Sequence, residues 1–455
     1  AGVSPQRGPG RADRRPPDRE PGTPQRGDSL LRHDPGDLRH RLDRPPPEVP
    51  WRGRPEPLVA HRLRQSAREL ARELGSRGHR VDIYTQLNGS GHDRIVDLYN
   101  NVRLIHLSAG NNGHFEKLTL YYYLAEFLRA LEKFKDQQEL RYDLIHSHYW
   151  LSGRLGNWVQ ERWNIPHIVM FHTLGVVKNI VGLAEQEPDL RLATERKLVH
   201  SSQRILAPTP AEKQNLIKFY HAAGEKIGVV PCGVNLDLFQ PQDKQAARKM
   251  LGLAENTPTA LYVGRFDPIK GIDRLLKAIA HLRHQQRVQL LIIGGDGPET
   301  DEFKNLQQLA RQLGIADSVN FVGRIEQNRL PPYYSAADTL VIPSYYESFG
   351  LVGLESLACG TPVVSTPVGA MRAILQNGNA GTLVDDAGPA ALAEGIAAMF
   401  IRQQAGEFSA EKVRASICQF GWKNVASDII DEYAAVFNRL SPHELPKASA
   451  RVSCR

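Results

Sequence analysis

From Gln65 onward the sequence alternates helical stretches with short strands that are apolar at nearly every position. Near the start of this region, SARELARELGSRGHRVDIYTQ has a helical apolar period, a glycine stop at Gly75 or Gly78, and then a strand over residues 80–85. Strands that are apolar on both faces must be covered on both faces, as in parallel sheets flanked by helices. The alternation therefore predicts an α/β fold built on parallel sheets.

A stretch rich in proline and glycine, PCGVNLDLFQPQ at residues 231–242, interrupts this alternation. Because a chain of 455 residues is too long for a single core, we expect two domains. The first is expected at residues 66–232 and the second at 243–420, with a linker at 233–242 and a final helix at 421–440. Both should be doubly wound, Rossmann-like parallel-sheet domains that face a ligand-binding cleft at the carboxyl ends of their strands.

Residues 1–65 have a different composition from the rest of the chain. They hold 14 Arg, 13 of the 30 Pro and no Lys, and with nine acidic residues they supply +5 of the net charge of +7. Without an apolar period this segment cannot bury enough surface to fold, so it is expected to be disordered. Two other interpretations stay open, namely a basic arm for an acidic partner and a non-native sequence from a shifted reading frame.

The composition of the remainder excludes several classes of protein. The near balance of charge outside residues 1–65 does not favour a nucleic-acid partner. No run of 18 apolar residues is present, so stable insertion in a membrane is not expected. The four cysteines, Cys232, Cys359, Cys418 and Cys454, lack metal-ligand spacing and read as reduced thiols. Together with the absence of an apolar leader, they predict a cytoplasmic location.

The most informative motif is PSYYESFGLVGLESLACGTPVVST at residues 343–366, which reads as a strand end, a tight turn, a helix and a second strand. The first amides of a helix have no intrahelical acceptor, and with the helix dipole they form an anion site. Glu347 precedes this helix and could accept hydrogen bonds from sugar hydroxyls, while Glu355 lies within it. The motif therefore suggests a site for a sugar attached to a diphosphate; the alternative is an ordinary buried unit with solvated glutamates.

The spacing of the two glutamates indicates nothing by itself, because chance predicts about 1.5 such pairs in a chain of this composition. Two further pairs have the same spacing: Glu48/Glu56 and Glu187/Glu195. Only the context of strand, glycine turn and helix distinguishes Glu347 and Glu355.

The first turn of the second domain, VGRFDPIKG, places Arg265 after a strand and Lys270 just before a helix that begins near Gly271. Both cations can point at one spot, where they would neutralise a departing nucleoside diphosphate. The alternative is that they are loop cations paired with Asp267 or Asp273.

Three other strand ends carry candidate ligand-binding residues. Gly323 and Arg324 follow the strand VNFVG and could lie beside a base or ribose. In the first domain, His148 and His172 follow neighbouring strands and could bond a sugar hydroxyl or carry a proton. A single histidine at a strand end is more often a capping or packing residue.

In order and spacing, VGRFDPIKG, GGDGP, FVGR and SYYESFGLVGLESLACGTPVVST resemble the family of retaining nucleotide-sugar glycosyltransferases with the two-domain GT-B fold. The segments HSHYWLSG, FHTLG..KN and EPDLR...E resemble the branch of that family that contains sucrose-phosphate synthase and inositol-phosphate N-acetylglucosaminyltransferases. The resemblance runs from about Gln65 to Phe437. It implies transfer of a hexosyl group, with retention, from a nucleoside diphosphate sugar to a hydroxyl of a small acceptor.

The resemblance also implies roles for individual residues. In catalysis and donor binding, Arg265 and Lys270 would hold the diphosphate, Glu347 and His172 the donor sugar, and Glu355 the ribose, with backbone amides from Phe349, Gly350 and Leu351. A set for a phosphorylated sugar or cyclitol acceptor would comprise Lys117, Tyr149, Thr173 and Arg191, near His148. Front-face attack, in which the leaving phosphate takes the acceptor's proton, needs no protein nucleophile. No cofactor is required by this scheme, although Mg²⁺ stays possible and no metal-ligating residue is predicted.

One departure from the family pattern concerns the start of the fold. The family begins with a β-strand and a Gly-Gly loop, and residues 1–65 contain neither an apolar strand nor a GG pair. This departure leaves open a catalytically impaired remnant that binds a nucleotide sugar. The resemblance itself leaves a second alternative, a membrane-surface transferase with a lipid acceptor, as mannosyltransferases of this family use.

Overall fold

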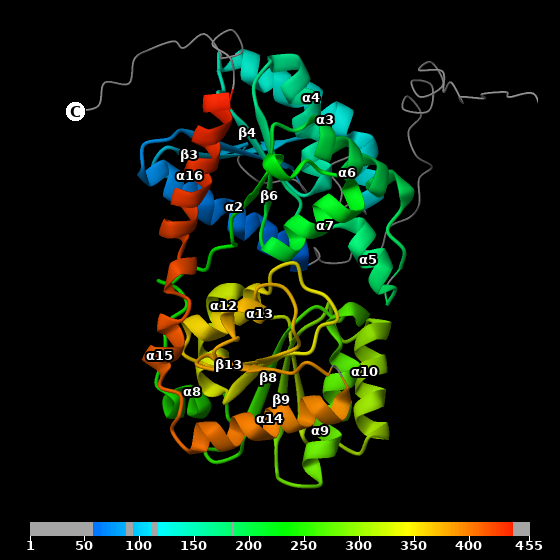
Figure 1. Cartoon of the computed structure of the whole chain (residues 1–455), viewed down its shortest axis with the longest axis vertical. Coiled ribbons are helices and arrows are strands. Elements are labelled where there is room, and N and C mark those ends of the chain that lie inside the picture. The colour runs from blue at the N-terminus through cyan, green and yellow to red at the C-terminus, as the bar shows by residue number, and fades with distance from the viewer. Residues whose placement is uncertain (1–57, 88–93, 111–116, 184, 387, 440–455) are drawn as a thin grey trace, which may run out of the picture. The chain divides into compact units, whose positions relative to one another are not determined.

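The computed structural model describes residues 58–439 except 88–93, 111–116, 184 and 387 (Figure 1). All of these belong to one unit of the chain, residues 50–455. Most of the segment predicted to be disordered, residues 1–57, lies outside the described residues. Its last part is helical, so the prediction was wrong for residues 58–65. The helix extends this far because no proline or glycine interrupts residues 58–64.

The first domain contains six described α-helices and seven described strands. The strands are β1 (Val81–Gln86), β2 (Ile95–Tyr99), β3 (Val102–Leu107), β4 (Ile145–His148), β5 (His167–Met170), β6 (Arg204–Ala207) and β7 (Ile227–Val229). The helices are α2 (Leu58–Ser76), α3 (Lys117–Gln137), α4 (Trp150–Trp163), α5 (Gly175–Val181), α6 (Asp189–Ser201), α7 (Pro210–Tyr220) and the 3-10 turn η1 (Gly224–Lys226).

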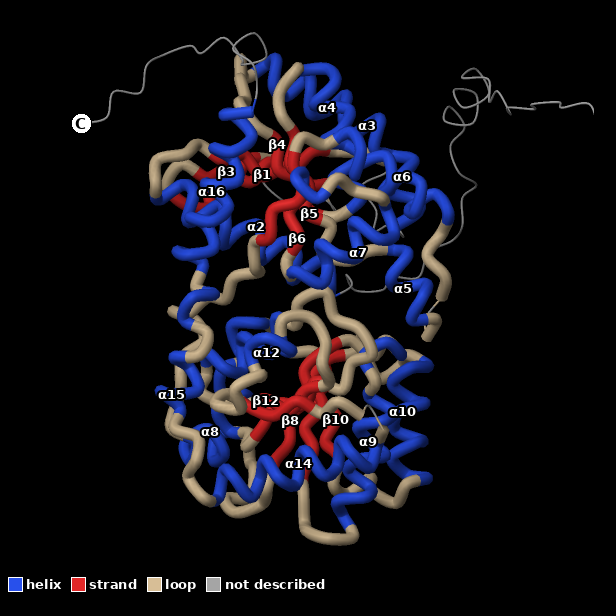
Figure 2. Tube along the Cα trace, viewed as in Figure 1, coloured by secondary structure: helices blue, strands red, loops and turns tan. Residues whose placement is uncertain are grey.

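The strands of the first domain form two sheets, with the orders β1-β3-β2 and β4-β5-β6-β7 (Figure 2). As predicted, β1 pairs in parallel with β3, and β4 to β7 are parallel throughout. β2 is antiparallel to β3 and was not predicted. Its residues alternate between exposed and half-buried, as in an edge strand that faces water, so it lacks the continuous apolar run of the other strands.

The second domain is a six-stranded parallel sheet with helices on both faces. Its strands are β8 (Thr259–Gly264), β9 (Gln289–Gly294), β10 (Val319–Gly323), β11 (Thr339–Ile342), β12 (Val363–Ser365) and β13 (Gly381–Leu383). Its α-helices are α8 (Lys244–Met250), α9 (Ile272–Arg283), α10 (Asp301–Gln312), α11 (Pro331–Ala336), α12 (Leu351–Ala358), α13 (Met371–Ile374), α14 (Pro389–Gln404) and α15 (Ala410–Ala415). The 3-10 turns are η2 (Pro268–Lys270), η3 (Gln327–Arg329) and η4 (Cys418–Phe420), and the last helix is α16 (Trp422–Arg439).

The order β10-β9-β8-β11-β12-β13 is the doubly wound order, in which the chain starts at the centre and reverses direction beside β8. The predicted fold of two Rossmann-like domains is therefore confirmed. The reversal places the turns after β8 and β11 side by side at the carboxyl edge of the sheet, where such folds bind ligands.

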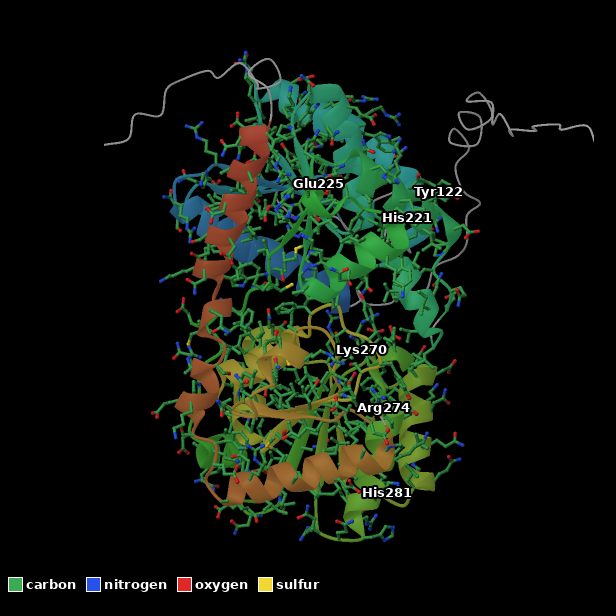
Figure 3. The ribbon with its side chains drawn as sticks, in the orientation of Figure 1. Tyr122, His221, Glu225, Lys270, Arg274 and His281 are labelled. Atoms are coloured by element: carbon green, nitrogen blue, oxygen red, sulfur yellow. The ribbon has the colours of Figure 1, made fainter. Side chains whose placement is uncertain are left out.

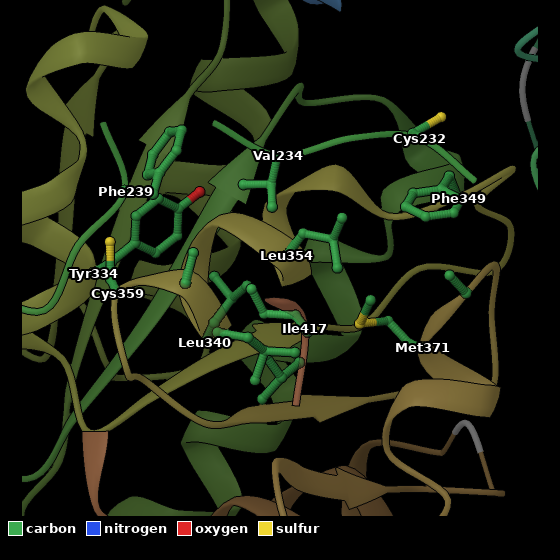
Figure 4. Close-up of a cluster of buried hydrophobic side chains, with 14 of the residues drawn as sticks. Cys232, Val234, Phe239, Tyr334, Leu340, Phe349, Leu354, Cys359, Met371 and Ile417 are labelled. Atoms are coloured by element: carbon green, nitrogen blue, oxygen red, sulfur yellow. The ribbon is translucent and has the colours of Figure 1, made fainter. Parts of the chain in front are cut away.

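Strand β8 shows why a continuous apolar run is needed at the centre of the sheet. Leu261 and Val263 point into one buried cluster, while Ala260 and Tyr262 point into another on the opposite face. Figure 4 shows part of the first cluster, where Leu340 of β11 lies near buried residues of the surrounding helices. Each fully buried large apolar side chain contributes about 1.5–3 kcal/mol to folding.

Helix α16 follows the second domain in sequence but contacts the first. The hydroxyl of Tyr433 is 2.8 Å from Nδ1 of His146, and Arg204 donates to Glu432 across 2.5 Å. A Cβ atom at Gly228 would lie 2.2 Å from Oε1 of Glu432, so this strand and the helix pack closely. Helix α16 therefore completes the packing of β4, β6 and β7.

Candidate functional site

The turns after β8 and β11 are joined by an ion pair between Lys270 and Glu347. Nζ of Lys270 lies 2.6 Å from Oε1 of Glu347, and the hydroxyl of Ser344 donates to the same oxygen across 2.9 Å. Both charged side chains are partly exposed, so a ligand can reach them. In Figure 3, Lys270 precedes Arg274 and His281, which follow one another along α9.

Backbone packing fixes the two turns against each other at Gly271. Its φ is +67°, and a Cβ atom there would lie 2.2 Å from the carbonyl oxygen of Pro343. Only glycine combines this conformation with so close an approach of two backbones. The position of Lys270 beside Glu347 therefore depends on the glycine that follows Lys270.

Arg265 does not share this ion pair; it lies 3.2 Å from Asp267 in its own turn. The alternative pairing of Arg265 with Asp267 therefore describes the structure, whereas Lys270 pairs with Glu347, and Asp273 pairs with Lys277. A partly exposed pair of this kind contributes about 0–1 kcal/mol, so a ligand phosphate can compete for the guanidinium.

Helix α12 begins next to Glu347 with Gly350 in a left-handed conformation, φ +97°. The carbonyl of Phe349 accepts a hydrogen bond from the amide of Ala370 across 2.8 Å, and the Phe349 side chain is buried. The chain is thus held so that the amides of Phe349, Gly350 and Leu351, at the start of α12, follow the Glu347 turn. The anion site that the sequence predicts at these amides stays a prediction.

Glu355 has a different environment from Glu347. It is buried in α12, where its two oxygens accept from Gln327 across 2.8 Å and from Tyr334 across 2.7 Å. It lines a small pocket together with Glu69 of α2 and Asn235. Sequence reasoning missed Gln327 and Tyr334, because neither lies near Glu355 in the chain.

Gly323 ends β10, two strands from β8 on the same carboxyl edge, and its φ is +85°. Arg324, which follows it, is exposed. The structure thus places both residues on the edge that carries Lys270 and Glu347, and their proposed role beside a base or ribose stays a prediction.

In the first domain, the histidines at the ends of β4 and β5 contact each other directly. Nδ1 of His148 lies 2.8 Å from Nε2 of His172, and the ring of His146 stacks on His148 at 4.4 Å between centroids. Burial lowers the pKa of His148 to about 4 and that of His172 well below its usual value. Both rings are therefore neutral at pH 7 and can exchange hydrogen bonds, but not charge, with a ligand.

The backbone is strained at these same strand ends. Tyr149 has φ +79° and His172 has φ +61°, a region that residues other than glycine rarely adopt. Such a conformation costs about 1–3 kcal/mol and clusters at functional sites. No sequence pattern predicts it here, since neither position holds glycine or asparagine.

Arg191 is the centre of a buried polar cluster beside these residues. It donates to the hydroxyl of Thr173 across 3.0 Å and to that of Tyr149 across 3.3 Å, and its side chain is 1% exposed. Three of the four residues predicted to bind an acceptor phosphate thus lie together. The fourth, Lys117, begins α3, and its side chain lies outside the described residues.

Sequence reasoning missed the partners that balance the charge of Arg191. Glu187 lies 2.8 Å from Arg191 and also pairs with Lys178, while Glu195 lies 2.7 Å from Arg191. Glu195 also accepts a hydrogen bond from the amide of Gly175 across 3.0 Å. Part of the signal was present in the sequence, because Arg191 and Glu195 have the four-residue spacing that places side chains together on a helix, whereas Glu187 precedes α6.

A hydrogen bond connects the first domain to the Glu347 turn. The hydroxyl of Tyr346 donates to Glu212 of α7 across 3.3 Å. Burial raises the pKa of Glu212 to about 7, and nearby Glu195 adds to the shift. Neither residue was predicted to belong to the site.

Among the described residues, no three histidine, cysteine or acidic side chains are grouped so as to hold a metal ion. In the same part of the chain, no helix is both long and apolar enough to cross a bilayer.

Comparison with known proteins gives consistent matches over both domains. Residues 63–238 match the family described as "Glycosyltransferase Family 4", and residues 243–412 match that described as "Glycosyl transferases group 1". The D-inositol 3-phosphate glycosyltransferase 2 of Catenulispora acidiphila is 38% identical over 376 residues, which cover 80% of this chain and 88% of that protein. The D-inositol 3-phosphate glycosyltransferase of Geodermatophilus obscurus is 37% identical over 383 residues, which cover 82% and 84%.

Among solved structures, sucrose-phosphate synthase from Thermosynechococcus elongatus has a TM-score of 0.74 and 32% identity, covering 82% of this chain and 92% of its own. Anabaena HepE, solved in complex with UDP and glucose, has a TM-score of 0.66 and 20% identity, covering 82% and 96%. The second likeness concerns the fold alone.

Proposed function

The chain belongs to family 4 of the retaining glycosyltransferases, and on this premise we propose that it transfers a hexosyl group from a uridine diphosphate sugar to a hydroxyl of a small phosphorylated cyclitol or sugar. The observation that carries the donor half of this proposal is the contact of Lys270 with Glu347 at the start of α12. The acceptor half rests on the Arg191 cluster.

The donor would bind at the carboxyl edge of the second domain. A diphosphate needs positive charge and amide donors, which Lys270, Arg265 and the N-terminus of α12 supply within neighbouring turns. Once phosphate oxygens occupy Lys270, the carboxylate of Glu347 is released to accept hydrogen bonds from hydroxyls of the donor sugar. Glu355, further along α12, would accept from the ribose. Uridine is proposed by analogy, because Anabaena HepE, which has the same fold, was solved with UDP.

The acceptor phosphate would bind beside Arg191 in the first domain. Tyr149, Thr173 and Lys178 surround it, and Lys117 begins a helix in the same domain. As the cluster stands, two cations, Arg191 and Lys178, face two carboxylates, so a phosphate has to displace one of them. Glu187 is the one at the rim, because its side chain is 13% exposed whereas that of Glu195 is fully buried. A cyclitol phosphate is proposed from the names of the curated relatives.

In the reaction, an acceptor hydroxyl would attack the anomeric carbon from the face that the diphosphate leaves. The bond from that carbon to the phosphate oxygen breaks, the new glycosidic bond forms, and the hydroxyl proton passes to the departing phosphate. The cations of the second domain stabilise the negative charge that develops on the diphosphate. The neutral rings of His148 and His172 would position sugar hydroxyls by hydrogen bonding without adding charge.

The experiment is a donor and acceptor matrix on the purified chain. UDP-glucose and UDP-N-acetylglucosamine are each incubated with inositol 3-phosphate, with fructose 6-phosphate and with the corresponding unphosphorylated compounds, and UDP release is measured. NMR of the product gives the configuration of the new bond. Release that requires a phosphorylated acceptor, with retention, supports the proposal.

Two other outcomes correspond to the alternatives. Release that requires an acceptor in lipid vesicles points to a membrane-surface transferase. Binding of UDP, seen by calorimetry, without release from either donor points to an impaired remnant.

A further inference from the structure

Tyr346 belongs to the second domain, but its side chain lies in the first. It packs against a buried apolar cluster whose other described members all come from the first domain, among them Leu174 in the turn after β5 and Leu216 of α7. Its hydroxyl donates to Oε2 of Glu212, also on α7, across 3.3 Å. The ring and the hydroxyl are therefore anchored in one domain, while the backbone of the same residue belongs to the other.

Glu212 holds this hydroxyl at a buried position. The residue lies in the first turn of α7, where its amide donates to the hydroxyl of Thr209 across 3.1 Å. Its Oε2 also accepts from Asn215 at 3.5 Å, and its Oε1 has no hydrogen-bond partner within the described part of the chain. A buried carboxyl with so few donors depends strongly on the one that Tyr346 supplies.

The turn after β5 forms the other wall around the Tyr346 ring. Burial raises the pKa of Tyr346 well above its usual value, and the backbone of Leu174, next to the hydroxyl, opposes this shift. The residues on either side of Leu174 are fixed by the Arg191 cluster. Thr173 accepts from Arg191 across 3.0 Å, and the amide of Gly175 donates to a buried glutamate of that cluster across 3.0 Å. The ring thus rests on a turn that the cluster holds in place.

In the second domain, residues 346–348 have little backbone support of their own. They form no helix or strand, and none of their amides donates to a backbone carbonyl in the described part of the chain. The backbone is fixed on either side of them, where Tyr345 donates to the carbonyl of Ile269 across 2.8 Å and Phe349 accepts from Ala370 across 2.8 Å. Side chains therefore decide where this short segment lies.

Glu347, the next residue after Tyr346, has its own contacts through one carboxylate oxygen. Lys270 and Ser344 both bond its Oε1. Once a donor diphosphate occupies Lys270, as proposed above, Glu347 keeps Ser344 and its covalent link to the anchored Tyr346. Because adjacent Cα atoms are about 3.8 Å apart, a shift of Tyr346 moves Glu347 with it.

We propose that Tyr346 is a positioning residue for Glu347, through which the first domain takes part in recognising the donor sugar. With the ring held between α7 and the turn at residues 173–175, the carboxylate of Glu347 lies where sugar hydroxyls reach it. Without the anchor, residues 346–348 relax and the carboxylate moves away from those hydroxyls. The inference rests on the proposed function, because it takes Glu347 as a ligand of the donor sugar. The diphosphate, bound by Lys270 and Arg265, does not depend on this anchor.

The test compares the affinity of the full chain for UDP with its affinity for UDP-glucose and UDP-N-acetylglucosamine, measured by calorimetry without acceptor. The ratio of the dissociation constants of UDP and of the UDP-sugar gives the contribution of the sugar. Tyr346→Phe keeps the ring and removes only the hydroxyl. It should lower this ratio by about five- to tenfold, while the affinity for UDP stays within about twofold of the wild type. A general loss of structure would instead weaken the binding of UDP as well.

Tyr345→Phe is the matched control. This neighbouring tyrosine is exposed and its ring stacks on Arg274 within the second domain, so its hydroxyl is not anchored in the first. Both affinities should stay unchanged in this variant.

Two changes at Glu212 separate the hydrogen bond from other effects of the residue. Glu212→Gln keeps an acceptor for the hydroxyl and should preserve the contribution of the sugar. Glu212→Met removes the acceptor and should reproduce the loss seen in Tyr346→Phe. The double variant Tyr346→Phe/Glu212→Met should lose no more than either single variant, since both changes remove the same bond.

Three results would each overturn the proposal. One is an unchanged ratio in Tyr346→Phe, with folding checked by circular dichroism. Another is a loss of UDP affinity in that variant as large as the loss for the UDP-sugars. The third is an equal loss in Tyr345→Phe. Failure of the proposed function is a different result, namely the absence of sugar transfer in the donor and acceptor matrix, and it does not depend on these affinities.

Discussion

The hydroxyl of Tyr346 donates a hydrogen bond to Glu212, so the residue immediately before Glu347 is tied to helix α7 of the other domain. Glu347, which we propose to bind the donor sugar, is thus positioned by contacts with both domains. Any change in the protonation of Glu212 acts next to the site.

Glu212→Gln should make the free energy of unfolding less dependent on pH. The folded pKa of about 7 lies above the ordinary value of 4.5, so the folded state binds the proton more tightly. The stability that Glu212 contributes is present below pH 4.5 and is lost as the pH rises to 7, about 3 kcal/mol in all. Glutamine keeps the acceptor for Tyr346 without a charge. Urea denaturation from pH 5 to pH 8 should show the free energy of unfolding of the variant rising relative to that of the wild type. Parallel plots of this free energy against pH would exclude the effect.

His148→Asn should act in the opposite direction. The folded pKa of about 4 lies below the ordinary 6.5, so the stability contribution of the neutral ring is present above pH 6.5 and is lost as the pH falls toward 4. The wild type should therefore lose about 3 kcal/mol more than the variant between pH 7 and pH 4. Glu212 and His148 have opposite effects on the pH dependence of stability over overlapping pH ranges. The contribution of each is therefore measured with its own variant. Ring signals of His148 that titrate near pH 6.5 by NMR would contradict the prediction.

Lys270→Met should lower kcat/KM for the donor by about 10²–10³, because the proposed diphosphate site loses one of its two cations. The matched control is Lys277→Met on α9, the helix that begins two residues after Lys270, where an exposed lysine pairs with Asp273. That control should stay within about twofold of the wild type. UDP release at varied donor concentration measures both, and equal losses in the two variants would remove Lys270 from the donor site.

Glu187→Gln should lower the KM for a phosphorylated acceptor by about five- to tenfold, because phosphate no longer competes with a carboxylate for Lys178 and Arg191. The KM for the donor should not change. Glu185→Gln, at an exposed position in the same loop, is the control and should leave both values unchanged. A raised acceptor KM in the Glu187 variant would mean that this carboxylate assists binding.

Gly271→Ala should destabilise the protein by about 3 kcal/mol or more, since a Cβ atom there meets the carbonyl of Pro343 at 2.2 Å as well as an unfavourable φ. Gly252→Ala isolates the conformational part, because Gly252 has φ +66° with no atom within 4 Å of the added Cβ. That control should cost only about 1 kcal/mol. Thermal unfolding of the two variants gives the comparison, and equal costs would rule out the packing argument.

Sequence predicts those parts of the structure that depend on local pattern. The run at residues 259–264 is apolar because alternate side chains of β8 enter cores on opposite faces. The turn that holds Lys270 and the start of α12 were also predicted from local pattern, because glycines at strand ends mark both places. The residues of β2 alternate between exposed and half-buried, so its sequence resembles that of a loop, and the strand was missed.

Contacts between distant segments could not be predicted in the same way. Tyr346 and Glu212 are 134 positions apart, and no local pattern connects them. The left-handed backbone of Tyr149 and His172 is imposed by surrounding packing, not by the residue type. The pair of Arg191 and Glu195 was predictable in principle from its spacing on α6. Only the eight-residue spacing of Glu187 and Glu195 was considered, and it was attributed to chance.

The return of α16 to the first domain has a consequence for biosynthesis. The first domain emerges from the ribosome long before Glu432 and Tyr433 are synthesised. The partners of these two residues, Arg204 and His146, lie in that domain. Domains usually fold as units in order of synthesis. Here the first domain cannot complete its packing until α16 has been synthesised, and the surface that α16 covers stays exposed until then. The nascent chain is therefore most exposed to chaperones during translation of the second domain.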